Sequence, residues 1–315
     1  MVLTYPESPA DRDSWILSRR GQHIPLNPRE PYAYFLEDER SAGGGVAPVA
    51  TIMLTNAECP FRCVMCDLWR NTLAERTQAG SIPEQIEFAL TRLPRARVLK
   101  LYNSGSFFDT RAVPIEDYSA IAMQIRGFDR VIVECHPAFV GERCIAFRDL
   151  IEGKLEIAMG LETAHPGVLE KLNKRMTLEQ FAAAAGFLGR NGIDLRAFIL
   201  VQPPFMAAHD ALDWAQRSLD FAFDQGTTAA TLIPTRGGNG AMETLDFCPP
   251  DLRVLEMAMH YGLGMQRGRV FADLWDLKRH SECAVCFGTR LERLRAMNLT
   301  QQIGNPVHCD DCEAA

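Results

Sequence analysis

The sequence predicts an α/β protein built around a parallel β-sheet, because near-continuous apolar segments of strand length alternate with amphipathic helical segments. Two groups of cysteines, one directly after the first of these strands and one near the C-terminus, further predict metal centres. Right-handed crossovers between buried parallel strands form either an open doubly wound sheet or a partial barrel. Periodicity alone does not separate these two architectures.

The chain begins with a polar lead-in. Residues 1–45 are rich in Pro, Gly and Arg and end in a Ser-Ala-Gly-Gly-Gly run. We expect an irregular segment here, with at most one short helix. The character of the chain changes at residue 46, and residues 46–246 form the alternating region that we expect to be the main domain.

Six strands are expected in this main domain. The first of them, VAPVATIMLT, is mostly apolar and rich in β-branched residues, and the others share its apolar character. The six lie at residues 46–55, 96–102, 129–134, 155–162, 193–201 and 227–235.

Helices are expected between the strands. Two of them begin with the spacing of an N-terminal capping box, Ser81 with Glu84 and Thr177 with Gln180. Pro114 is suited to the first turn of another. The expected helices lie at residues 81–93, 114–127, 141–153, 166–173, 177–192 and 209–226.

The C-terminal region, residues 247–315, departs from this alternation and contains the second group of cysteines. We expect a small C-terminal metal-binding module here. Its one clear helix, at residues 288–304, has Leu291, Leu294 and Met297 on one side, which would pack the module onto the main domain.

Composition and charge restrict the function. The 315 residues, 47% of them hydrophobic, suffice for one large domain with a smaller appendage. A net charge of −7 argues against binding long nucleic acid through its phosphates. No apolar run approaches the roughly 18–20 residues of a transmembrane helix, and no secretory signal is visible, so we expect a cytoplasmic protein without a membrane partner. Ten cysteines in such a protein indicate metal or redox chemistry.

The first group of cysteines, Cys59, Cys63 and Cys66, has the spacing C-x3-C-x2-C directly after the first strand. Three thiolates on one short loop can hold three corners of a [4Fe-4S] cluster, whereas clusters that only transfer electrons use four cysteines. The fourth iron would then be open to a small molecule, as in catalytic metal sites. A zinc site or three buried thiols are the alternatives. No further His or Cys follows until Cys135, which disfavours zinc at this loop.

This motif, and the chain over roughly residues 46–240, resembles the radical S-adenosylmethionine (SAM) superfamily. Residues 102–114, 131–140, 155–181 and 195–205 look like segments of the archaeosine synthase radical SAM lyase, and the longest also resembles the elongator acetyltransferase and methylthiotransferase domains. The resemblance implies a partial six-stranded (β/α)6 TIM-like barrel. It also implies reductive cleavage of SAM at the open iron, which yields methionine and a 5′-deoxyadenosyl radical.

The resemblance further assigns residues to the binding of SAM. Met65, which precedes the last cysteine of the motif, would contact the adenine. The segment after the second strand would hold the amino group of the methionine moiety, although its usual form in the family is Gly-Gly-Glu. Here that segment consists of Asn103, Ser104, Gly105 and Ser106.

Three charged residues complete the predicted SAM site. Glu134 ends the third strand and Glu162 the fourth, where carboxylates suit the ribose hydroxyls or the amino group of SAM. Lys174 matches a basic position of the family that can pair with the SAM carboxylate.

The second group consists of two C-x2-C pairs separated by 22 residues, which is close to the zinc-ribbon pattern. It predicts a metal centre and leaves the metal open between a structural zinc and an auxiliary iron–sulfur cluster. His280 and His308 lie near the pairs, where histidines usually support a metal site from outside. The four predicted ligands are Cys283, Cys286, Cys309 and Cys312.

Four further residues carry weaker signals. Cys135 and Cys144 lack partner spacing and are expected to be core thiols, and Cys248 is expected to be a spacer thiol. Arg236, beside the Gly-rich loop at residues 237–240, could pair with a substrate anion.

The sequence therefore predicts a radical SAM enzyme that abstracts hydrogen from a small molecule, a peptide or a natural-product precursor. Modification of a tRNA base is the alternative within the class, and a non-catalytic metal-binding scaffold is the alternative outside it. A radical SAM enzyme also needs a low-potential electron donor, such as flavodoxin or ferredoxin.

Overall fold

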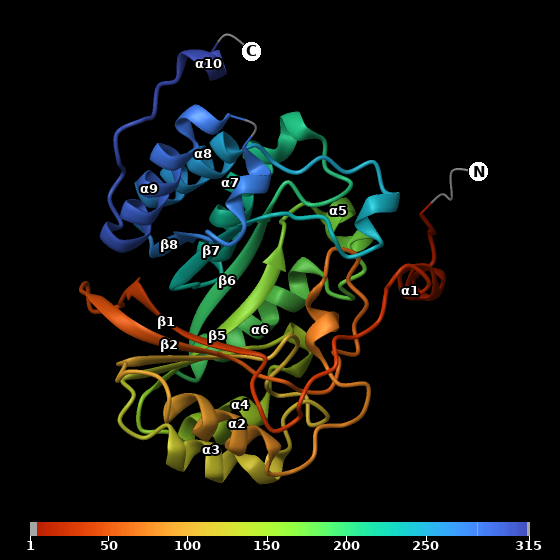
Figure 1. The fold of residues 1–315 in the computed structure, drawn as a ribbon, viewed down its shortest axis with the longest axis vertical. Coiled ribbons are helices and arrows are strands. Elements are labelled where there is room, and N and C mark those ends of the chain that lie inside the picture. The colour runs from red at the N-terminus through yellow and green to blue at the C-terminus, as the bar shows by residue number, and fades with distance from the viewer. Residues whose placement is uncertain (1–4, 282, 314–315) are drawn as a thin grey trace.

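A computed structural model describes residues 5–281 and 283–313. Residues 1–4 of the predicted lead-in, and residues 282, 314 and 315 of the predicted C-terminal module, lie outside the described residues. In the described part of the chain, the centre of the molecule is one eight-stranded sheet, curled into a half-barrel, whose strands are ordered as they occur in the sequence (Figure 1). The strands are β1 (Ala33–Arg40), β2 (Val46–Met53), β3 (Val98–Tyr102), β4 (Arg130–Glu134), β5 (Lys154–Glu162), β6 (Asp194–Val201), β7 (Ala229–Pro234) and β8 (Arg269–Ala272).

The six expected strands correspond to β2–β7, and all of them are parallel. The expected strand count of six is wrong, because β1 pairs antiparallel with β2 and β8 extends the parallel sheet beyond β7. The sequence of β1, AYFLEDER, is half charged, and β8 has only four residues, so neither has the apolar run of a buried strand. The lead-in contains one short helix, as expected, and in addition the strand β1, which the expected irregular segment did not include.

Most of the α-helices cover the outer face of the sheet, whereas α1 and α10 lie away from it (Figure 1). In Figure 1, α2, α3 and α4 lie together below the sheet, and α7, α8 and α9 lie together above it. The α-helices are α1 (Pro9–Leu17), α2 (Ser81–Leu90), α3 (Tyr118–Gln124), α4 (Glu142–Leu150), α5 (Pro166–Lys171), α6 (Leu178–Arg190), α7 (Ala211–Asp224), α8 (Leu252–Gly264), α9 (Ala284–Thr300) and α10 (Asp310–Glu313).

One of the two expected capping boxes is present. Thr177 caps α6: its Oγ1 accepts from the N–H of Gln180, and the Gln180 side chain accepts from the N–H of Thr177. The box expected at Ser81 is wrong, because Ser81 is already the first residue of α2 and Gly80, with φ +88°, is the N-cap. Glycine is favoured in that left-handed conformation, so the backbone of Gly80 begins α2 without a side-chain cap.

The inner face of the half-barrel is polar at its N-terminal end. Arg196 on β6 is 2% exposed and forms ion pairs with Glu39 on β1 (2.6 Å) and Glu156 on β5 (2.7 Å). Arg130 and Arg269 also pair with Glu156, at 2.9 and 3.0 Å. These charges fill the interior at the N-terminal ends of the parallel strands. The opposite end, at the C-terminal ends of these strands, is left for the functional site.

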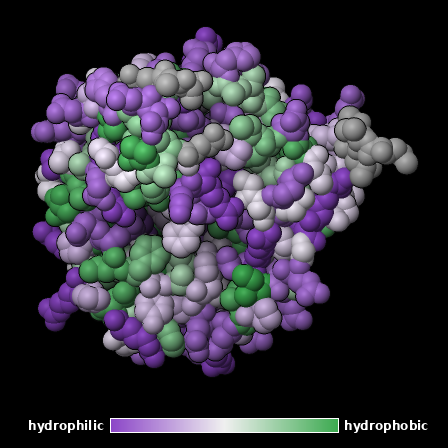
Figure 2. All heavy atoms as spheres, turned by 45° about the horizontal axis from the view of Figure 1, so that its top comes forward, coloured by the Kyte–Doolittle hydropathy of each residue, from purple (hydrophilic) through white to green (hydrophobic). Residues whose placement is uncertain are grey.

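No helix among the described residues is long and apolar enough to cross a membrane. Hydrophilic residues predominate over most of the face in Figure 2, and the hydrophobic ones lie in separate small groups.

Candidate functional site

The predicted cluster ligands lie on the loop that follows β2, at the C-terminal end of the parallel strands. Cys59, Cys63 and Cys66 are each partly exposed. The loop turns tightly between the second and third cysteines, where the N–H of Cys66 donates to the carbonyl oxygen of Cys63 at 3.2 Å. The negative charges of Cys66 and Cys59 both raise the pKa of Cys63, so the three thiols lie within electrostatic range of one another.

Burial raises the pKa of all three thiols, and that of Cys66 to about 12. Without a bound metal these thiols are therefore protonated at neutral pH, and binding of metal would have to release their protons. Lys174 opposes the effect of burial at Cys63 and at Cys59. A positive side chain thus lies beside two of the three thiols.

The segment after β3 packs directly against the cysteine loop. A Cβ on Gly105 would lie 3.3 Å from the Cβ of Cys59, so glycine permits this close approach. Glu134, at the end of β4, accepts from the backbone N–H groups of Asn103 (2.7 Å) and Ser104 (3.1 Å), both through Oε2. Burial raises the pKa of Glu134 to about 7, although these two hydrogen bonds lower it.

Glu162 and Lys174 form a buried ion pair of 2.6 Å. Although burial opposes it, Glu162 raises the pKa of Lys174 above its ordinary value. A Cβ on Gly160 would lie 2.2 Å from Glu162 Oε1 and 2.6 Å from Lys174 Nζ. The absence of a side chain at this position therefore leaves room for the pair.

Met65 lies in a small apolar cluster at this end of the barrel. It is partly buried and packs against a cluster of buried residues that includes Val64, Leu172 and Leu200. The structure thus brings Met65, the segment of residues 103–106, Glu134, Glu162 and Lys174 to the same edge of the sheet as the three cysteines.

The chemistry of these residues fits a cluster with a bound SAM. Three thiols on one loop can provide three ligands to a cluster and leave one iron open. Both side-chain amide atoms of Asn103 are buried and have no hydrogen-bond partner among the described residues. Because an unpaired buried amide costs free energy, a polar ligand is expected beside Asn103.

Sequence reasoning missed three residues that hold this site together. His136 stacks on Phe61, which lies between the first two cysteines, with ring centroids 3.8 Å apart. The side chain of Asn239 donates to the carbonyl oxygens of Val64 (2.7 Å) and Cys66 (3.2 Å).

The third residue, Tyr32, has its hydroxyl 3.1 Å from Ser104 Oγ. Asn239 lies within the Gly-rich loop at residues 237–240, and His136 lies within a segment that resembles the family, but no local pattern revealed either contact.

Two aromatic side chains, Tyr102 and Phe198, line the barrel interior between the charged layer and the cysteine loop. Their rings make an edge contact at 6.1 Å, and both side chains are partly exposed. Arg236, after β7, pairs with Asp273, after β8, at 3.3 Å and donates to the carbonyl oxygen of Trp275 at 2.9 Å. Arg236 therefore already has an acidic partner, and its binding of a substrate anion stays a prediction.

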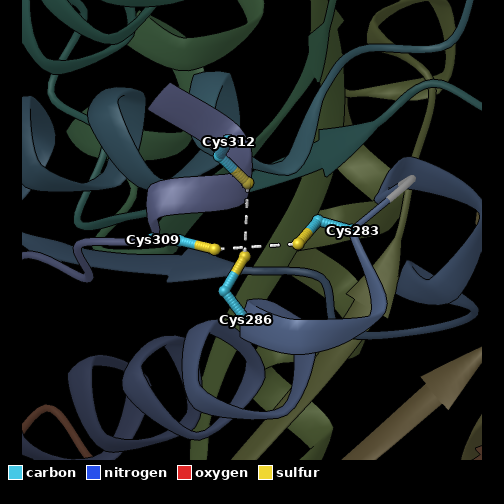
Figure 3. Close-up of side chains that lie close together, drawn as sticks. All are labelled: Cys283, Cys286, Cys309 and Cys312. Atoms are coloured by element: carbon cyan, nitrogen blue, oxygen red, sulfur yellow. Dashed lines mark hydrogen bonds between the residues drawn. The ribbon is translucent and has the colours of Figure 1, made fainter. Parts of the chain in front are cut away.

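The two predicted C-x2-C pairs meet at one point (Figure 3). The Sγ atoms of Cys283, Cys286, Cys309 and Cys312 all lie within 4.8 Å of one another, so these four residues could hold a metal ion. His280 and His308 are not members of this group. His280 Nδ1 lies instead 3.0 Å from the carbonyl oxygen of Pro250.

The remaining cysteines lie apart from both groups. Cys135 and Cys144 are buried in the main apolar core, as expected. Cys248 is exposed.

Comparison with known proteins was made on sequence and on structure. No family model matches the chain. An uncharacterized protein of Methanocaldococcus jannaschii is 25% identical, over 87% of this chain and 82% of that protein. Archaeosine synthase subunit beta of Methanosarcina acetivorans is also 25% identical, over 84% of this chain and 82% of that protein. The same subunit of Thermococcus kodakarensis is 24% identical, over 50% of this chain and 51% of that protein.

Among solved structures, methylornithine synthase has a TM-score of 0.48 at 12% identity and covers 82% of each chain. The Elp3 protein of Methanocaldococcus infernus has a TM-score of 0.47 at 13% identity and covers 60% of this chain and 51% of its own. The likeness to two archaeosine synthase subunits confirms the predicted resemblance to that enzyme.

Proposed function

We propose that this protein is a radical SAM enzyme whose cluster is held by Cys59, Cys63 and Cys66. The observation that supports the proposal is the convergence of these thiols with Gly105 and with the Lys174–Glu162 pair at the C-terminal edge of parallel strands. Enzymes built on such sheets place their chemistry at this edge.

A [4Fe-4S] cluster, when bound, would supply the electron that cleaves SAM to methionine and a 5′-deoxyadenosyl radical. The protein would bind and orient SAM. Glu134, with both of its hydrogen bonds on Oε2, keeps Oε1 for the ribose hydroxyls or the amino group of SAM. Lys174 would attract the SAM carboxylate, and Glu162 would keep Lys174 charged. Met65 would contact the adenine.

The proposal is tested by anaerobic reconstitution with iron and sulfide, followed by dithionite and SAM, with 5′-deoxyadenosine as the product measured. The unmodified protein should form the nucleoside and Cys66→Ala should not. Cys248→Ala, which removes an exposed cysteine outside both groups, is the matched control and should retain activity. If no cluster assembles in the unmodified protein, the scaffold alternative replaces this proposal.

For the substrate, we propose a small molecule, a peptide or a natural-product precursor. The net charge of −7 supports this class, because a surface for long nucleic acid is usually basic. The aromatic side chains of Tyr102 and Phe198, above a closed charged layer, would offer such a substrate an apolar contact inside the barrel.

Modification of a tRNA base is the second candidate. The observation that favours it is the similarity to archaeosine synthase subunit beta of Methanosarcina acetivorans over most of both chains. Co-purification of tRNA that is lost as salt is raised would support this candidate, because phosphate contacts weaken steeply with ionic strength. Purification without RNA at low salt would leave the first substrate class.

We also propose a division of the chain into a lead-in at residues 1–45, which contributes β1 to the sheet, the barrel at 46–246 and a metal-binding module at 247–315, which contributes β8. A flavodoxin or ferredoxin would supply the electron. The module would hold a metal at its four cysteines, with zinc and an auxiliary iron–sulfur cluster as the alternatives that the sequence leaves open.

A further inference from the structure

We infer that the C-terminal cysteines bind one tetrahedral zinc ion, and that they do not bind an iron–sulfur cluster. The inference concerns four residues, Cys283, Cys286, Cys309 and Cys312, and it does not depend on the radical chemistry proposed for the other cysteine group.

Sulfur–sulfur distances carry the inference. The Sγ atoms of Cys283 and Cys309 are 3.7 Å apart, and those of Cys286 and Cys312 are 3.6 Å apart (Figure 3). Thiolates that bind one zinc ion at about 2.3 Å in a tetrahedron lie about 3.8 Å from one another. The observed distances match that edge, and each joins a cysteine of the first pair to one of the second.

An iron–sulfur cluster needs a wider arrangement. In a four-iron cluster each thiolate binds a different iron, so neighbouring thiolates are separated by an iron–iron distance and by two outward iron–sulfur bonds. In a two-iron cluster, the two thiolates on one iron are separated in the same way from the two thiolates on the other iron. Four sulfurs that all lie within 4.8 Å of one another leave no room for either.

Two disulfides are also inconsistent with the geometry. The two sulfurs of a disulfide are about 2.03–2.05 Å apart. Both cross-pair distances exceed it by more than 1 Å, and all four cysteines are free thiols in the structure.

The surroundings of the cysteine quartet, which consists of Cys283, Cys286, Cys309 and Cys312, are suited to a charged thiolate centre. Four thiolates on a divalent cation carry a net charge of −2, and Arg290 Nε donates to Cys286 Sγ at 3.2 Å. The Arg290 side chain is 8% exposed and also pairs with Glu256 on α8. Arg293, one turn further along α9, pairs with the other oxygen of Glu256 at 3.0 Å. A buried cation thus supports the quartet and connects it to the helix that packs against the sheet.

The same contacts indicate a structural role. Four protein ligands close the coordination sphere of a tetrahedral ion, so no position is left for water or substrate. Arg293 donates to the carbonyl oxygens of Asn305 (2.7 Å) and Gly304 (3.1 Å), within the segment that returns from α9 to the second cysteine pair. The ion would fix this returning segment, whose residues 302–308 are exposed or half-buried, to the start of α9.

The test is the metal content of the full-length protein, purified without oxygen and without added iron or zinc. We expect one zinc per chain in the unmodified protein and also in the Cys59→Ala/Cys63→Ala/Cys66→Ala variant, which lacks the other cysteine group. Cys309→Ser/Cys312→Ser should lose the zinc. Exchange of zinc for Co²⁺ should produce the visible absorption of a tetrahedral cobalt thiolate, a readout independent of activity.

Arg290 is tested by competition with a zinc chelator. Loss of a group that supports a metal ligand typically weakens metal affinity about 10–100-fold, which we expect for Arg290→Lys. Arg295→Lys is the matched control, because Arg295 is on the same helix and its exposed side chain pairs only with Glu292 among the described residues. Its zinc affinity should be unchanged.

Two results would overturn the inference. One is iron, with or without sulfide, in place of zinc in the variant that lacks the first cysteine group. The other is a metal-free protein in which the four thiols become titratable only after reduction. Because the zinc content of the unmodified protein already separates one zinc per chain from none, misfolding of a variant does not obscure the answer.

Discussion

The imidazole of His136 lies nearly face to face with the ring of Phe61, with centroids 3.8 Å apart and planes inclined by 24°. The contact joins the end of β4 to the cysteine loop. His136 also donates from Nε2 to the carbonyl oxygen of Lys174 (2.9 Å), and its backbone N–H donates to Ser106 Oγ (2.6 Å). Its Nδ1 accepts from the N–H of Ala138, which assigns the proton to Nε2. One residue therefore connects three segments of the proposed SAM site.

We predict that His136→Ala impairs this site through the position of the cysteine loop. Misplacement by a fraction of an ångström should lower the rate of 5′-deoxyadenosine formation about 10–100-fold. It should also alter the electron paramagnetic resonance spectrum of the reduced cluster with SAM. Burial lowers the pKa of His136 to about 3, so the imidazole is neutral above that pH and the pH profile should keep its shape. His209→Ala, at an exposed histidine, should have no effect. An altered pH profile in His136→Ala would assign His136 a different role.

We predict that SAM binds more tightly as Glu134 ionises. Because burial raises the pKa of Glu134 to about 7, the folded protein binds a proton there that the unfolded chain has lost. The contribution of Glu134 to stability is therefore present below its unfolded pKa and is lost as pH rises to about 7. A cationic SAM amino group would favour the carboxylate, so affinity should rise up to about tenfold between about pH 6 and about pH 8.

Calorimetric titration of SAM across this pH range provides the measurement. Glu134→Gln should bind weakly with a flat pH dependence, whereas Glu142→Gln, at an exposed position on α4, should keep the slope. A slope that survives in Glu134→Gln would show that another group titrates.

We predict that Asn239→Ala reduces the loading of the cluster. Asn239 is 3% exposed and donates to the carbonyl oxygens of Val64 and Cys66, while its Oδ1 accepts from the N–H groups of Ala241 (3.0 Å) and Met242 (2.8 Å). Its loss would free the cysteine loop. Iron and sulfide per chain after reconstitution should fall to less than about half, since loss of a supporting group weakens metal binding about 10–100-fold.

Asn27→Ala is the control for Asn239, because Asn27 is exposed and its side chain bonds only locally among the described residues, to Glu30 at 2.8 Å and to the N–H of Arg29 at 3.0 Å. Equal iron content in both variants would contradict the prediction.

We predict that Gly160→Ala weakens SAM binding more than it weakens the fold. The new Cβ would displace the ends of the Glu162 and Lys174 side chains, which are flexible, while the backbone stays in place. Both charges of the pair remain, so the midpoint of thermal unfolding should fall less than after removal of one partner of a buried pair. SAM affinity should fall at least about tenfold through displacement of the pair that we assign to the carboxylate.

Gly189→Ala in α6 is the matched control for Gly160. No atom lies within 4 Å of a Cβ at Gly189, so this variant should gain up to about 1 kcal/mol of stability and bind SAM normally. Unaltered SAM binding in Gly160→Ala would separate the pair from the cofactor.

We predict that Arg196→Met strongly destabilises the protein, because Glu39 and Glu156 would both lose a buried partner, although Lys100 still pairs with Glu39, and Arg130 and Arg269 with Glu156. Loss of one partner of a buried pair costs about 3–5 kcal/mol, whereas Arg97→Met, which breaks the exposed pair with Asp129, should cost about 0–1 kcal/mol. Urea unfolding measures both. Although burial opposes it, Arg196 and Lys100 hold the pKa of Glu39 well below its usual range. The stability from Glu39 is therefore present at neutral pH and is lost as pH falls through that lowered value.

Much of the fold follows from local patterns in the sequence. Apolar runs predicted β2–β7, and the Thr177 capping box predicted the start of α6, because each pattern lies within one element. The spacing of the cysteines defined both candidate metal groups for the same reason. The structure then showed that the two C-x2-C pairs meet, as their spacing suggested.

By itself, therefore, the sequence determined the parallel strands β2–β7 and the loop that carries the first cysteine motif. It also determined that the two C-terminal C-x2-C pairs form one group. The tertiary structure decided that β1 and β8 join the sheet, that Glu39 reaches Arg196, and that His136 stacks on Phe61. The physical reason is the range of the interactions. Periodicity and spacing record bonds between neighbours in the chain, whereas strand register and barrel closure bring together side chains that lie 75 or 157 positions apart, as with Phe61 and His136 or with Glu39 and Arg196.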